Sequence, residues 1–323
     1  MSPSDQVAPD GGRDLGMATR GRGLVLATRG SELARWQADR VAALLRAAHP
    51  GLSVSLLEVE TAGDRRADVP ITDLAGQGVF VKEVQAAVLD GRADLAVHSA
   101  KDLPSTTPPG LVLACTPERA DFRDALVGST LARLPAGALV ATGSVRRRAQ
   151  LAWLRPDVTF TGLRGNIATR LAKAGPDRVV VVAAAALARL GLLARADEIL
   201  APEILLPQVA QGALAVECRV DDAAARAALA AIDDLTAHRA VAAERGFLRR
   251  LGGGCDLPVG ALATVIDGDI SIEGMLASPD GHVLLRARRV GGGEPAALGE
   301  VLAEELLAAG GDELLGRGES ARS

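Results

Sequence analysis

Three polar residues stand close together in the segment HSAKDLP, at positions 98–104. The overlapping stretch ADLAVHS predicts a buried strand, so Ser99, Lys101 and Asp102 fall at or just beyond its carboxyl end, with His98 packed on the opposite face. Open α/β sheets bind ligands at that edge. A carboxylate beside an ammonium group can stabilise a cation or transfer protons there. The alternative is a local Lys–Asp pair within a turn.

A second group of charged residues, all arginines, stands where predicted strands end or helices begin. Arg146 and Arg147 fall in the first turn of a helix predicted over 144–154, where the helix dipole favours anions. Arginines there predict a bound anion, and the guanidinium fork suits carboxylates. Because only three of the 36 basic residues are lysines, a solvated basic face is the alternative. The other members of this group are Arg29, Arg164, Arg170 and Arg189.

Two strand-to-helix junctions resemble each other, ATRGS at 27–31 and ATGS at 141–144. In each, a threonine ends the strand, and Ser31 or Ser144 opens the helix. The unpaired N–H groups at a helix start bind carboxylates and phosphates. Two such junctions facing each other predict an anion-binding cleft, whereas simple helix capping by serine is the alternative.

The segment LGGGCDLPVG (251–260) presents Cys255 behind three consecutive glycines, which give a loop conformational freedom. The other cysteines, Cys115 and Cys218, show no CxxC spacing, and the odd total favours neither a disulfide framework nor a zinc site. A lone cysteine is more often a small buried residue than a nucleophile. The segment by itself therefore leaves both roles open.

Length and composition limit the class of protein. The chain has 323 residues, 48% of them hydrophobic and 2% aromatic, which predicts two or three domains with cores of Ala, Val and Leu. The net charge of −4 gives no general attraction for nucleic acid. The longest apolar run, 179–188, is too short to cross a bilayer. We therefore expect a cytoplasmic monomer without metal, membrane or nucleic-acid partners, and a disordered tail at 1–20.

Strand and helix patterns alternate twice along the chain and then change. The predicted strands are 24–28, 54–60, 93–99, 138–142, 158–163 and 178–184, and the helices between them are 31–48, 80–91, 144–154 and 166–174. Two βαβαβ units imply parallel sheets, and a strand at 212–220 is expected to return to the first. After a helix at 238–251, a three-stranded β-meander and a helix at 296–310 follow.

The predicted fold class is therefore α/β, with two similar α/β lobes and a small C-terminal α+β domain built on a three-stranded antiparallel sheet with helices. The expected parts are domain 1 at 21–117 and 212–232, domain 2 at 122–208, and domain 3 at 235–315, which carries the cysteine loop.

These segments together resemble the hydroxymethylbilane synthase family, also called porphobilinogen deaminase, from about residue 24 to 310. The presence of so many segments in one order is far more specific than any single motif. The segments that carry the resemblance are ATRGS (27–31), GQGVFVKEV (76–84), ADLAVHSAKDLP (93–104), GSVRRRAQL (143–151), LRGNIATRL (163–171), LPQVAQGALAVECR (206–219) and LGGGCDLPVG (251–260).

The resemblance implies lobes like those of periplasmic binding proteins and a transferase of tetrapyrrole biosynthesis, which supplies haem, chlorophyll and corrins. Members of the family join four porphobilinogen molecules head to tail, with loss of ammonia, and release hydroxymethylbilane. Their cofactor is dipyrromethane, a two-pyrrole primer held by a thioether to a loop cysteine. The resemblance thus implies a covalent dipyrromethane on Cys255 and porphobilinogen as the small-molecule substrate.

The resemblance also implies a role for each matching residue. Asp102 and Lys101 match catalytic positions. Gly143 stands where many relatives have a hydroxyl residue, and Gln77 stands where a lysine is frequent. Cofactor-binding positions are matched by Cys255, Ser99, Lys101, Asp102, Thr142, Ser144, Arg146, Arg147, Arg164 and Gly165. Substrate-binding positions are matched by Arg29, Ser31, Phe80, Arg164, Arg170 and Arg189.

Two functions from other classes stay open at the level of the sequence. A two-lobed carboxylate-binding protein without catalysis has the same fold, because fold does not fix function. A Schiff-base enzyme would use Lys101 as its nucleophile.

Overall fold

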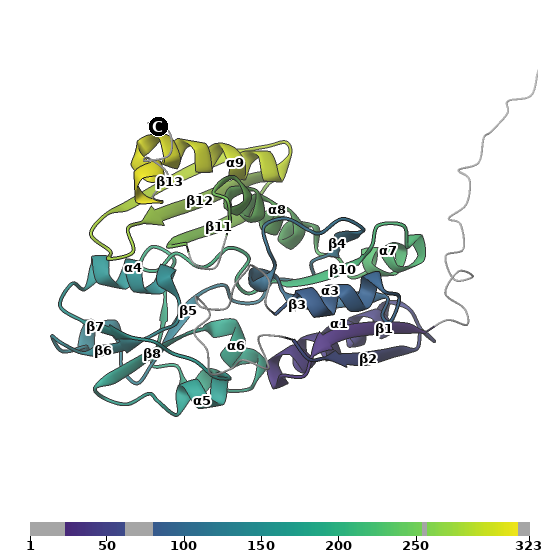
Figure 1. The fold of residues 1–323 in the computed structure, drawn as a ribbon, viewed down its shortest axis with the longest axis horizontal. Helices are drawn as coiled ribbons and strands as arrows, with labels where there is room; N and C mark the ends of the chain where they lie inside the picture. The colour runs from purple at the N-terminus through teal and green to yellow at the C-terminus, as the bar shows by residue number, and fades with distance from the viewer. Residues whose placement is uncertain (1–22, 62–79, 254–256, 316–323) are drawn as a thin grey trace, which may run out of the picture.

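The computed structural model describes residues 23–61, 80–253 and 257–315, which form two α/β lobes and a smaller C-terminal domain (Figure 1). The predicted tail at 1–20, Gln77 and Cys255 lie outside the described residues. In the described ranges, we find no helix that is both long and apolar enough to span a bilayer.

The first lobe is a five-stranded sheet with helices on both faces. Its elements are β1 (Leu24–Arg29), α1 (Glu32–Ala48), β2 (Val54–Val59), α3 (Lys82–Leu89), β3 (Leu95–Ser99), the short turn η3 (Ala100–Asp102), β4 (Leu111–Cys115), β10 (Leu214–Arg219) and α7 (Ala223–Ala230). The strands pair in the order β2-β1-β3-β10-β4. The pairings of β1 with β2 and β3 are parallel, whereas β10 is antiparallel to both neighbours. The predicted return of the 212–220 strand is therefore confirmed.

Successive side chains of β1 explain why helices cover both faces of this sheet. Leu26 packs in one cluster with residues of α1 and α7, and Ala27 packs in another with residues of α3. A sheet that is buried on both faces needs apolar side chains at consecutive positions. The stretch LVLA at the start of β1 supplies them.

The second lobe repeats this arrangement. Its elements are β5 (Asp124–Val127), β6 (Leu139–Ala141), α4 (Val145–Leu154), β7 (Thr159–Thr161), α5 (Ile167–Leu171), β8 (Arg178–Ala183), α6 (Ala184–Arg189) and β9 (Glu198–Leu200). The strand order is β7-β6-β8-β5-β9. The pairings of β6 with β7 and β8 are parallel, and β5 is antiparallel to β8 and β9. The prediction of two similar α/β lobes is confirmed.

The chain crosses between the lobes twice, and the crossing segments lie side by side. The N–H of Ala120 donates to the carbonyl of Gly212 at 3.2 Å. Gly212 has a φ of +87°, and a Cβ there would lie 2.5 Å from the oxygen of Ala120. Only glycine tolerates both the left-handed conformation and the close approach. Each crossing leads into the antiparallel strand of the next sheet, β5 or β10.

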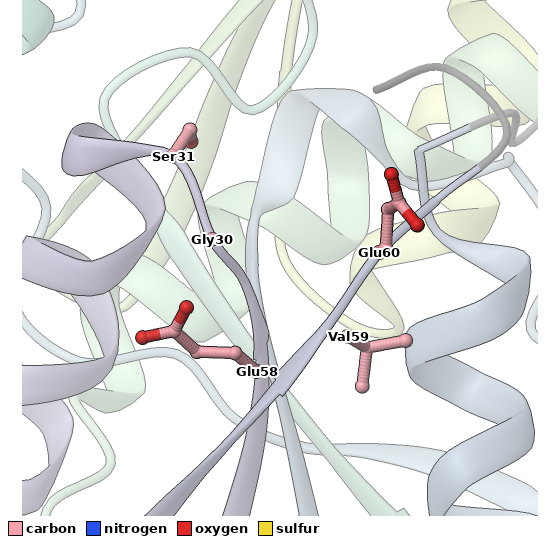
Figure 2. Close-up of a pocket in the computed structure, with 5 residues that line it drawn as sticks. All are labelled: Gly30, Ser31, Glu58, Val59 and Glu60. Carbon is pink, nitrogen blue, oxygen red and sulfur yellow. The ribbon is translucent and has the colours of Figure 1, made fainter. Parts of the chain in front are cut away.

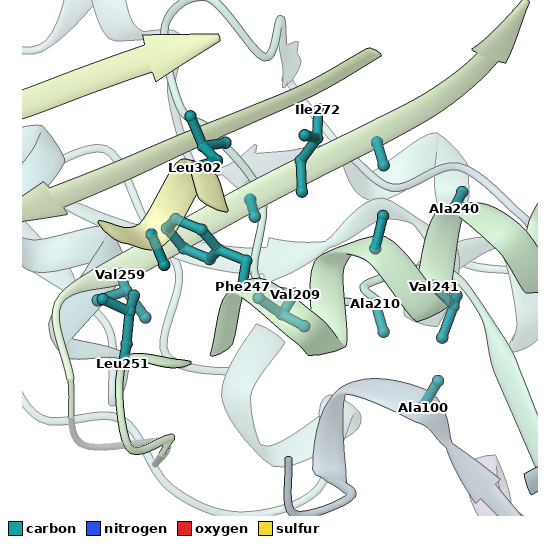
Figure 3. Packing of buried hydrophobic residues seen from close by; sticks show 14 of the residues in the cluster. Ala100, Val209, Ala210, Ala240, Val241, Phe247, Leu251, Val259, Ile272 and Leu302 are labelled. Atoms are coloured by element: carbon teal, nitrogen blue, oxygen red, sulfur yellow. The ribbon is translucent and has the colours of Figure 1, made fainter. Parts of the chain in front are cut away.

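The C-terminal domain packs two helices on a three-stranded antiparallel sheet, as predicted. Its elements are α8 (Leu235–Arg250), β11 (Val259–Ile266), β12 (Asp269–Ala277), β13 (Leu284–Gly291) and α9 (Pro295–Leu306). Phe247, Ile272 and Leu302 meet between the helices and the sheet (Figure 3). The same cluster includes Ala100 and Ala210, so this domain also packs against the lobe junction.

The start of α8 differs from its predicted start at residue 238. The side chain of Asp234 accepts a hydrogen bond from the N–H of Ala237 at 2.9 Å and caps the helix one turn earlier. The domain limits given above remain predictions.

Candidate active site

A pocket opens at the carboxyl end of the first-lobe sheet, where the sequence predicted ligand binding. Five of the predicted site residues line it together, although they come from three separate segments of the chain. These residues are Arg29, Ser31, Phe80, Ser99 and Asp102.

Local structure explains how the β1–α1 junction shapes this pocket. The Oγ of Ser31 accepts a hydrogen bond from the N–H of Ala34 at 3.3 Å, so Ser31 is the N-cap of α1. The guanidinium carbon of Arg29 lies 4.3 Å from the centre of the Phe80 ring, which is a cation–π contact. Arg29 and Phe80 therefore form one side of the pocket as a unit.

A neighbouring pocket at the ends of β1 and β2 has a different charge. Its lining consists of Gly30, Ser31, Glu58, Val59 and Glu60 (Figure 2). The carboxylate of Glu58 pairs with Arg35 at 3.1 Å. Because two carboxylates line this second pocket, it does not suit an anionic ligand.

Lys101 lies on the turn η3 and points to the junction between the lobes. Its Nζ donates to the Oε1 of Gln211 at 3.3 Å. Burial, with a smaller contribution from Arg147, lowers the pKa of Lys101 to about 8, while Asp102 and Asp124 act in the opposite direction. The side chain therefore exchanges protons closer to neutral pH than an ordinary lysine does.

The first-turn arginines of α4, Arg146 and Arg147, bind an anionic group of this chain, the carboxylate of Asp124. Arg146 pairs with Asp124 at 2.7 Å and Arg147 pairs with Asp124 at 2.6 Å, with all three side chains buried. Burial opposes ionisation of Asp124, but the two arginines outweigh it and hold the pKa of Asp124 below its usual range. The sequence reasoning missed Asp124. Roles for Arg146 and Arg147 in cofactor binding remain predictions.

The hydroxyl residues beside these arginines make local hydrogen bonds. The Oγ1 of Thr142 accepts from the N–H of Ser144 at 3.1 Å, and the Oγ of Ser144 accepts from the N–H of Arg147 at 3.4 Å. Both side chains thus shape the start of α4. At Gly143, an added Cβ would lie 2.8 Å from the carbonyl oxygen of Leu163. The departure from the family pattern at Gly143 therefore coincides with a close backbone approach.

The predicted site residues Arg164 and Arg170 differ from Arg146 and Arg147. In the part of the chain that the structure describes, no carboxylate forms an ion pair with Arg164 or Arg170, and the Nη1 of Arg164 is buried without a hydrogen-bond partner. The Nε of Arg170 donates to the carbonyl of Gly165 at 2.8 Å. Burial is the main cause that lowers the pKa of Arg170, and Asp102 opposes this shift. The charge of Asp102 in the first lobe thus favours the charged form of Arg170 in the second lobe.

Arg189, at the end of α6, connects the lobes. Its Nη2 donates to the carbonyl of Gly212 at 2.6 Å, and its guanidinium carbon lies 5.7 Å from the ring centre of Trp36. Its Nε is buried without a hydrogen-bond partner among the described residues, and burial lowers the pKa of Arg189 to about 10. Substrate binding by Arg189 remains a prediction.

Two further residues, His98 and Gln37, also line this pocket. His98 is buried, as predicted, with its Nε2 3.2 Å from the buried carboxylate of Glu217, but its position in the pocket lining contradicts the predicted placement on the opposite face. Gln37, which the sequence reasoning missed, is buried on α1 and its Nε2 donates to the Oγ of Ser99 at 2.8 Å. A glutamine on the apolar face of an amphipathic helix was the available signal.

Comparison with known proteins agrees with this geometry. The family model described as "Porphobilinogen deaminase, dipyromethane cofactor binding domain" matches residues 24–227, and "Porphobilinogen deaminase, C-terminal domain" matches residues 238–308. Porphobilinogen deaminase from Roseiflexus castenholzii is 49% identical over 297 residues, covering 90% of this chain and 98% of that protein. The protein of the same name from Syntrophotalea carbinolica is 47% identical over 300 residues, covering 90% and 95%.

Among solved structures, an ancestral cationic amino acid solute binding protein matches 67% of this chain and 92% of its own, at 11% identity and a TM-score of 0.39. The two family models together cover most of the chain, from β1 of the first lobe to α9 of the C-terminal domain. With relatives of nearly half identity along their whole length, this chain belongs to the porphobilinogen deaminase family, whose cofactor is dipyrromethane.

Proposed function

We propose that this chain carries out the transferase reaction of its family, the head-to-tail joining of four porphobilinogen molecules with loss of ammonia and release of hydroxymethylbilane. One observation carries the proposal at the level of residues: Arg29, Ser31, Phe80, Ser99 and Asp102 line a single pocket. The family assignment does not favour a binding protein without catalysis.

The charges of porphobilinogen fit the two walls of the site. Each molecule carries an acetate and a propionate, and the guanidinium of Arg29 with the hydroxyl of Ser31 offers donors to one of them. The face of Phe80 offers a surface for the pyrrole ring. Arg170 offers a further guanidinium from the second lobe, where the charge of Asp102 favours its charged form. A charged hydrogen bond in such a site contributes about 1.5–3 kcal/mol.

The cofactor also carries carboxylates, and the second lobe suits them. The buried Nη1 of Arg164 and Nε of Arg189 have no hydrogen-bond partner among the described residues, and a carboxylate would supply one. When bound through Cys255, dipyrromethane supplies the pyrrole α-carbon from which the product is extended. We assign its carboxylates to Ser99, Lys101, Thr142, Ser144, Arg146, Arg147, Arg164 and the backbone of Gly165, with Asp102 beside its ring nitrogens.

Asp102 and Lys101 divide the proton and charge chemistry. When ammonia leaves porphobilinogen, positive charge develops on the substrate, and the carboxylate of Asp102 stabilises it. Lys101, with a pKa of about 8, holds a proton at neutral pH and can pass it to the departing amine. Both residues lie on η3, and we assign them to the same step of the reaction.

The intact mass of the purified protein tests this function. We expect a mass that exceeds the sequence mass by two pyrrole units, together with a colour reaction with Ehrlich's reagent. Cys255→Ala should lose the adduct and the activity, whereas Cys218→Ala, which changes a buried thiol in β10, should keep both. An active enzyme of unmodified mass would contradict the proposal.

We also propose that the chain acts as a monomer in the cytoplasm. Cys115 and Cys218 are buried and form no disulfide with each other, which is compatible with a reducing compartment. Light scattering after size-exclusion chromatography should give a mass near 33.1 kDa. A stable dimer at micromolar concentration would contradict the monomer.

A further inference from the structure

Gln211 is fully buried between the lobes and contacts functional groups of both. Its Nε2 donates to the carbonyl of Phe122 at 2.8 Å and to the Oδ1 of Asp124 at 2.9 Å. A side-chain amide has two N–H groups, so both are used and the direction of the amide is fixed. Its Oε1 then faces the first lobe, where it accepts a hydrogen bond from the Nζ of Lys101 at 3.3 Å.

The backbone beside Gln211 is held in an uncommon conformation. Ala210 has a φ of +59°, which costs free energy for any residue with a Cβ. The N–H of Ala210 donates to the buried carboxylate of Glu244 at 2.5 Å. Arg119 holds this arrangement, since it pairs with Glu244 and donates from Nε to the carbonyl of Gln211. Strain that the surroundings maintain in this way points to a functional site.

We infer that Gln211 is a positioning residue, which fixes the ammonium group of Lys101 beside Asp102 by tying it to Asp124 of the second lobe. The inference rests on the proposed catalytic role of Lys101. Arg146 and Arg147 on α4 repel this ammonium group, and Asp102 on η3 and Asp124 on β5 attract it. The amide oxygen of Gln211 adds a directional acceptor, which charge alone does not provide.

A double-mutant cycle tests whether Gln211 acts through Lys101. Gln211→Met keeps the length of the side chain and removes the amide. In the otherwise unchanged holoenzyme it should lower kcat/KM by about ten- to a hundredfold, the value of a hydrogen bond to a charged group. In a Lys101→Met background it should lower kcat/KM no further, because the group it positions is gone. An equal factor in both backgrounds would overturn the inference.

The pH profile gives a readout that a loss of stability does not move. Removing the acceptor disfavours the ammonium form, so the alkaline limb of kcat/KM, set by a pKa of about 8 in the unchanged protein, should move to lower pH in Gln211→Met. Gln150→Met is the matched control, since Gln150 is a buried amide that bonds both backbone groups of Leu206. Gln150→Met should lower the free energy of unfolding and leave the alkaline limb of the kcat/KM profile unchanged. An equal shift of this limb in Gln150→Met and Gln211→Met would refute the positioning role.

The cycle also separates this inference from the proposed function. If Lys101→Met alone keeps full kcat/KM, the role of Lys101 itself is wrong. If Lys101→Met is slow and Gln211→Met still contributes its full factor, only the positioning role is wrong. Should Gln211→Met fail to fold, Gln211→Asn shortens the side chain by one methylene and is expected to show the same non-additivity with a smaller factor. Full additivity in Gln211→Asn would equally refute the inference.

Discussion

The two lobes share one strand order, and in each an antiparallel strand pairs with the last parallel strand: β10 with β3 in the first lobe, and β5 with β8 in the second. The two lobes differ in which strand of this pair carries a polar residue at the end. The strand that follows each crossing begins opposite the last residue of a parallel strand: Leu214 faces Ser99 in the first lobe, and Asp124 faces Ala183 in the second. The polar residue is on the parallel strand in one lobe and on the antiparallel strand in the other. At equivalent backbone positions, the first lobe therefore has the hydroxyl of Ser99 in its pocket, and the second lobe has the buried carboxylate of Asp124.

The helices that start at these edges differ in the same way. The first turn of α1 carries Glu32, which suits the helix dipole. The first turn of α4 carries Arg146 and Arg147, and Asp124 compensates their charge inside the protein. Arg164 and Arg170 of the second lobe form no ion pair with a carboxylate among the described residues. One scaffold thus gives a first-lobe pocket lined by Asp102, the proposed catalytic carboxylate, and a second lobe whose Arg164 and Arg170 retain positive charge.

Removing the buried carboxylate of the second lobe should have the largest effect. Asp124→Asn leaves two buried arginines without their counter-charge, which typically costs about 3–5 kcal/mol. Urea unfolding should show this loss in the free energy of unfolding. Asp121→Asn is the control, because Asp121 pairs with Arg123 near the surface and such pairs contribute about 0–1 kcal/mol. Equal losses in the two variants would mean that the buried carboxylate contributes no more to stability than a surface ion pair does.

The same pair predicts a pH dependence. The pKa of Asp124 in the folded protein lies below its ordinary value of 3.8, so the unfolded chain takes up this proton first as the pH falls. The stabilising contribution is therefore complete above about pH 4 and is lost as the pH falls through the folded-state pKa. The difference in stability between the unchanged protein and Asp124→Asn should shrink only below pH 3.8.

Removing the proposed catalytic carboxylate of the first lobe, Asp102, should affect turnover instead of stability. Asp102→Asn keeps the shape of the side chain and removes its charge, so kcat should fall by about a hundredfold or more while porphobilinogen still binds. Single-turnover kinetics and equilibrium binding measure the two quantities separately. In the control Asp94→Asn, which alters a buried carboxylate that bonds the N–H of Val25, stability should fall and kcat should hold. Near-normal kcat in Asp102→Asn would remove Asp102 from the reaction.

Arg164, which has no ion-pair partner in the described part of the chain, gives a third, smaller effect. Arg164→Met should raise the KM for porphobilinogen or slow cofactor assembly by about ten- to a hundredfold, the value of one charged hydrogen bond. Its free energy of unfolding should stay level, because no described carboxylate loses a partner. Arg178→Met, at an exposed position, should change neither quantity. A large loss of stability in Arg164→Met would show that this arginine has a structural anion, as Arg147 has.

The sequence predicts those parts of the molecule that depend on local patterns. The apolar runs at 24–28 and 178–184, and the serine caps at Ser31 and Ser144, each mark an element that the structure contains. The sequence could identify the pocket residues as site candidates because each stands at the end of a predicted strand or helix. Position relative to an element is a local property.

The parts that sequence reasoning missed depend on contacts between distant segments. The strands β5 and β9 have four and three residues, too few to show alternation, and they exist because each completes a sheet begun elsewhere. Asp124 is an ordinary aspartate in the sequence, and it gains its role from arginines 22 and 23 residues later. Gln211 gains its role from groups at least 87 residues away. Such pairings are set by tertiary structure and leave no periodic signal.

The smallest effect concerns the second-lobe junction, where Gly143 departs from the family pattern. A Cβ at Gly143 would meet the backbone carbonyl of Leu163 at 2.8 Å, so Gly143→Ser forces the two segments apart and should lower the free energy of unfolding by about 1 kcal/mol. Gly162→Ser is the matched control, since a Cβ there meets nothing within 4 Å, and it should stay within about 0.5 kcal/mol of the unchanged protein. If Gly143→Ser were as stable as Gly162→Ser and also faster, the added hydroxyl would be contributing a hydrogen bond to the bound ligand. In that case close packing against Leu163 would not be the reason that the β6–α4 junction has a glycine at position 143.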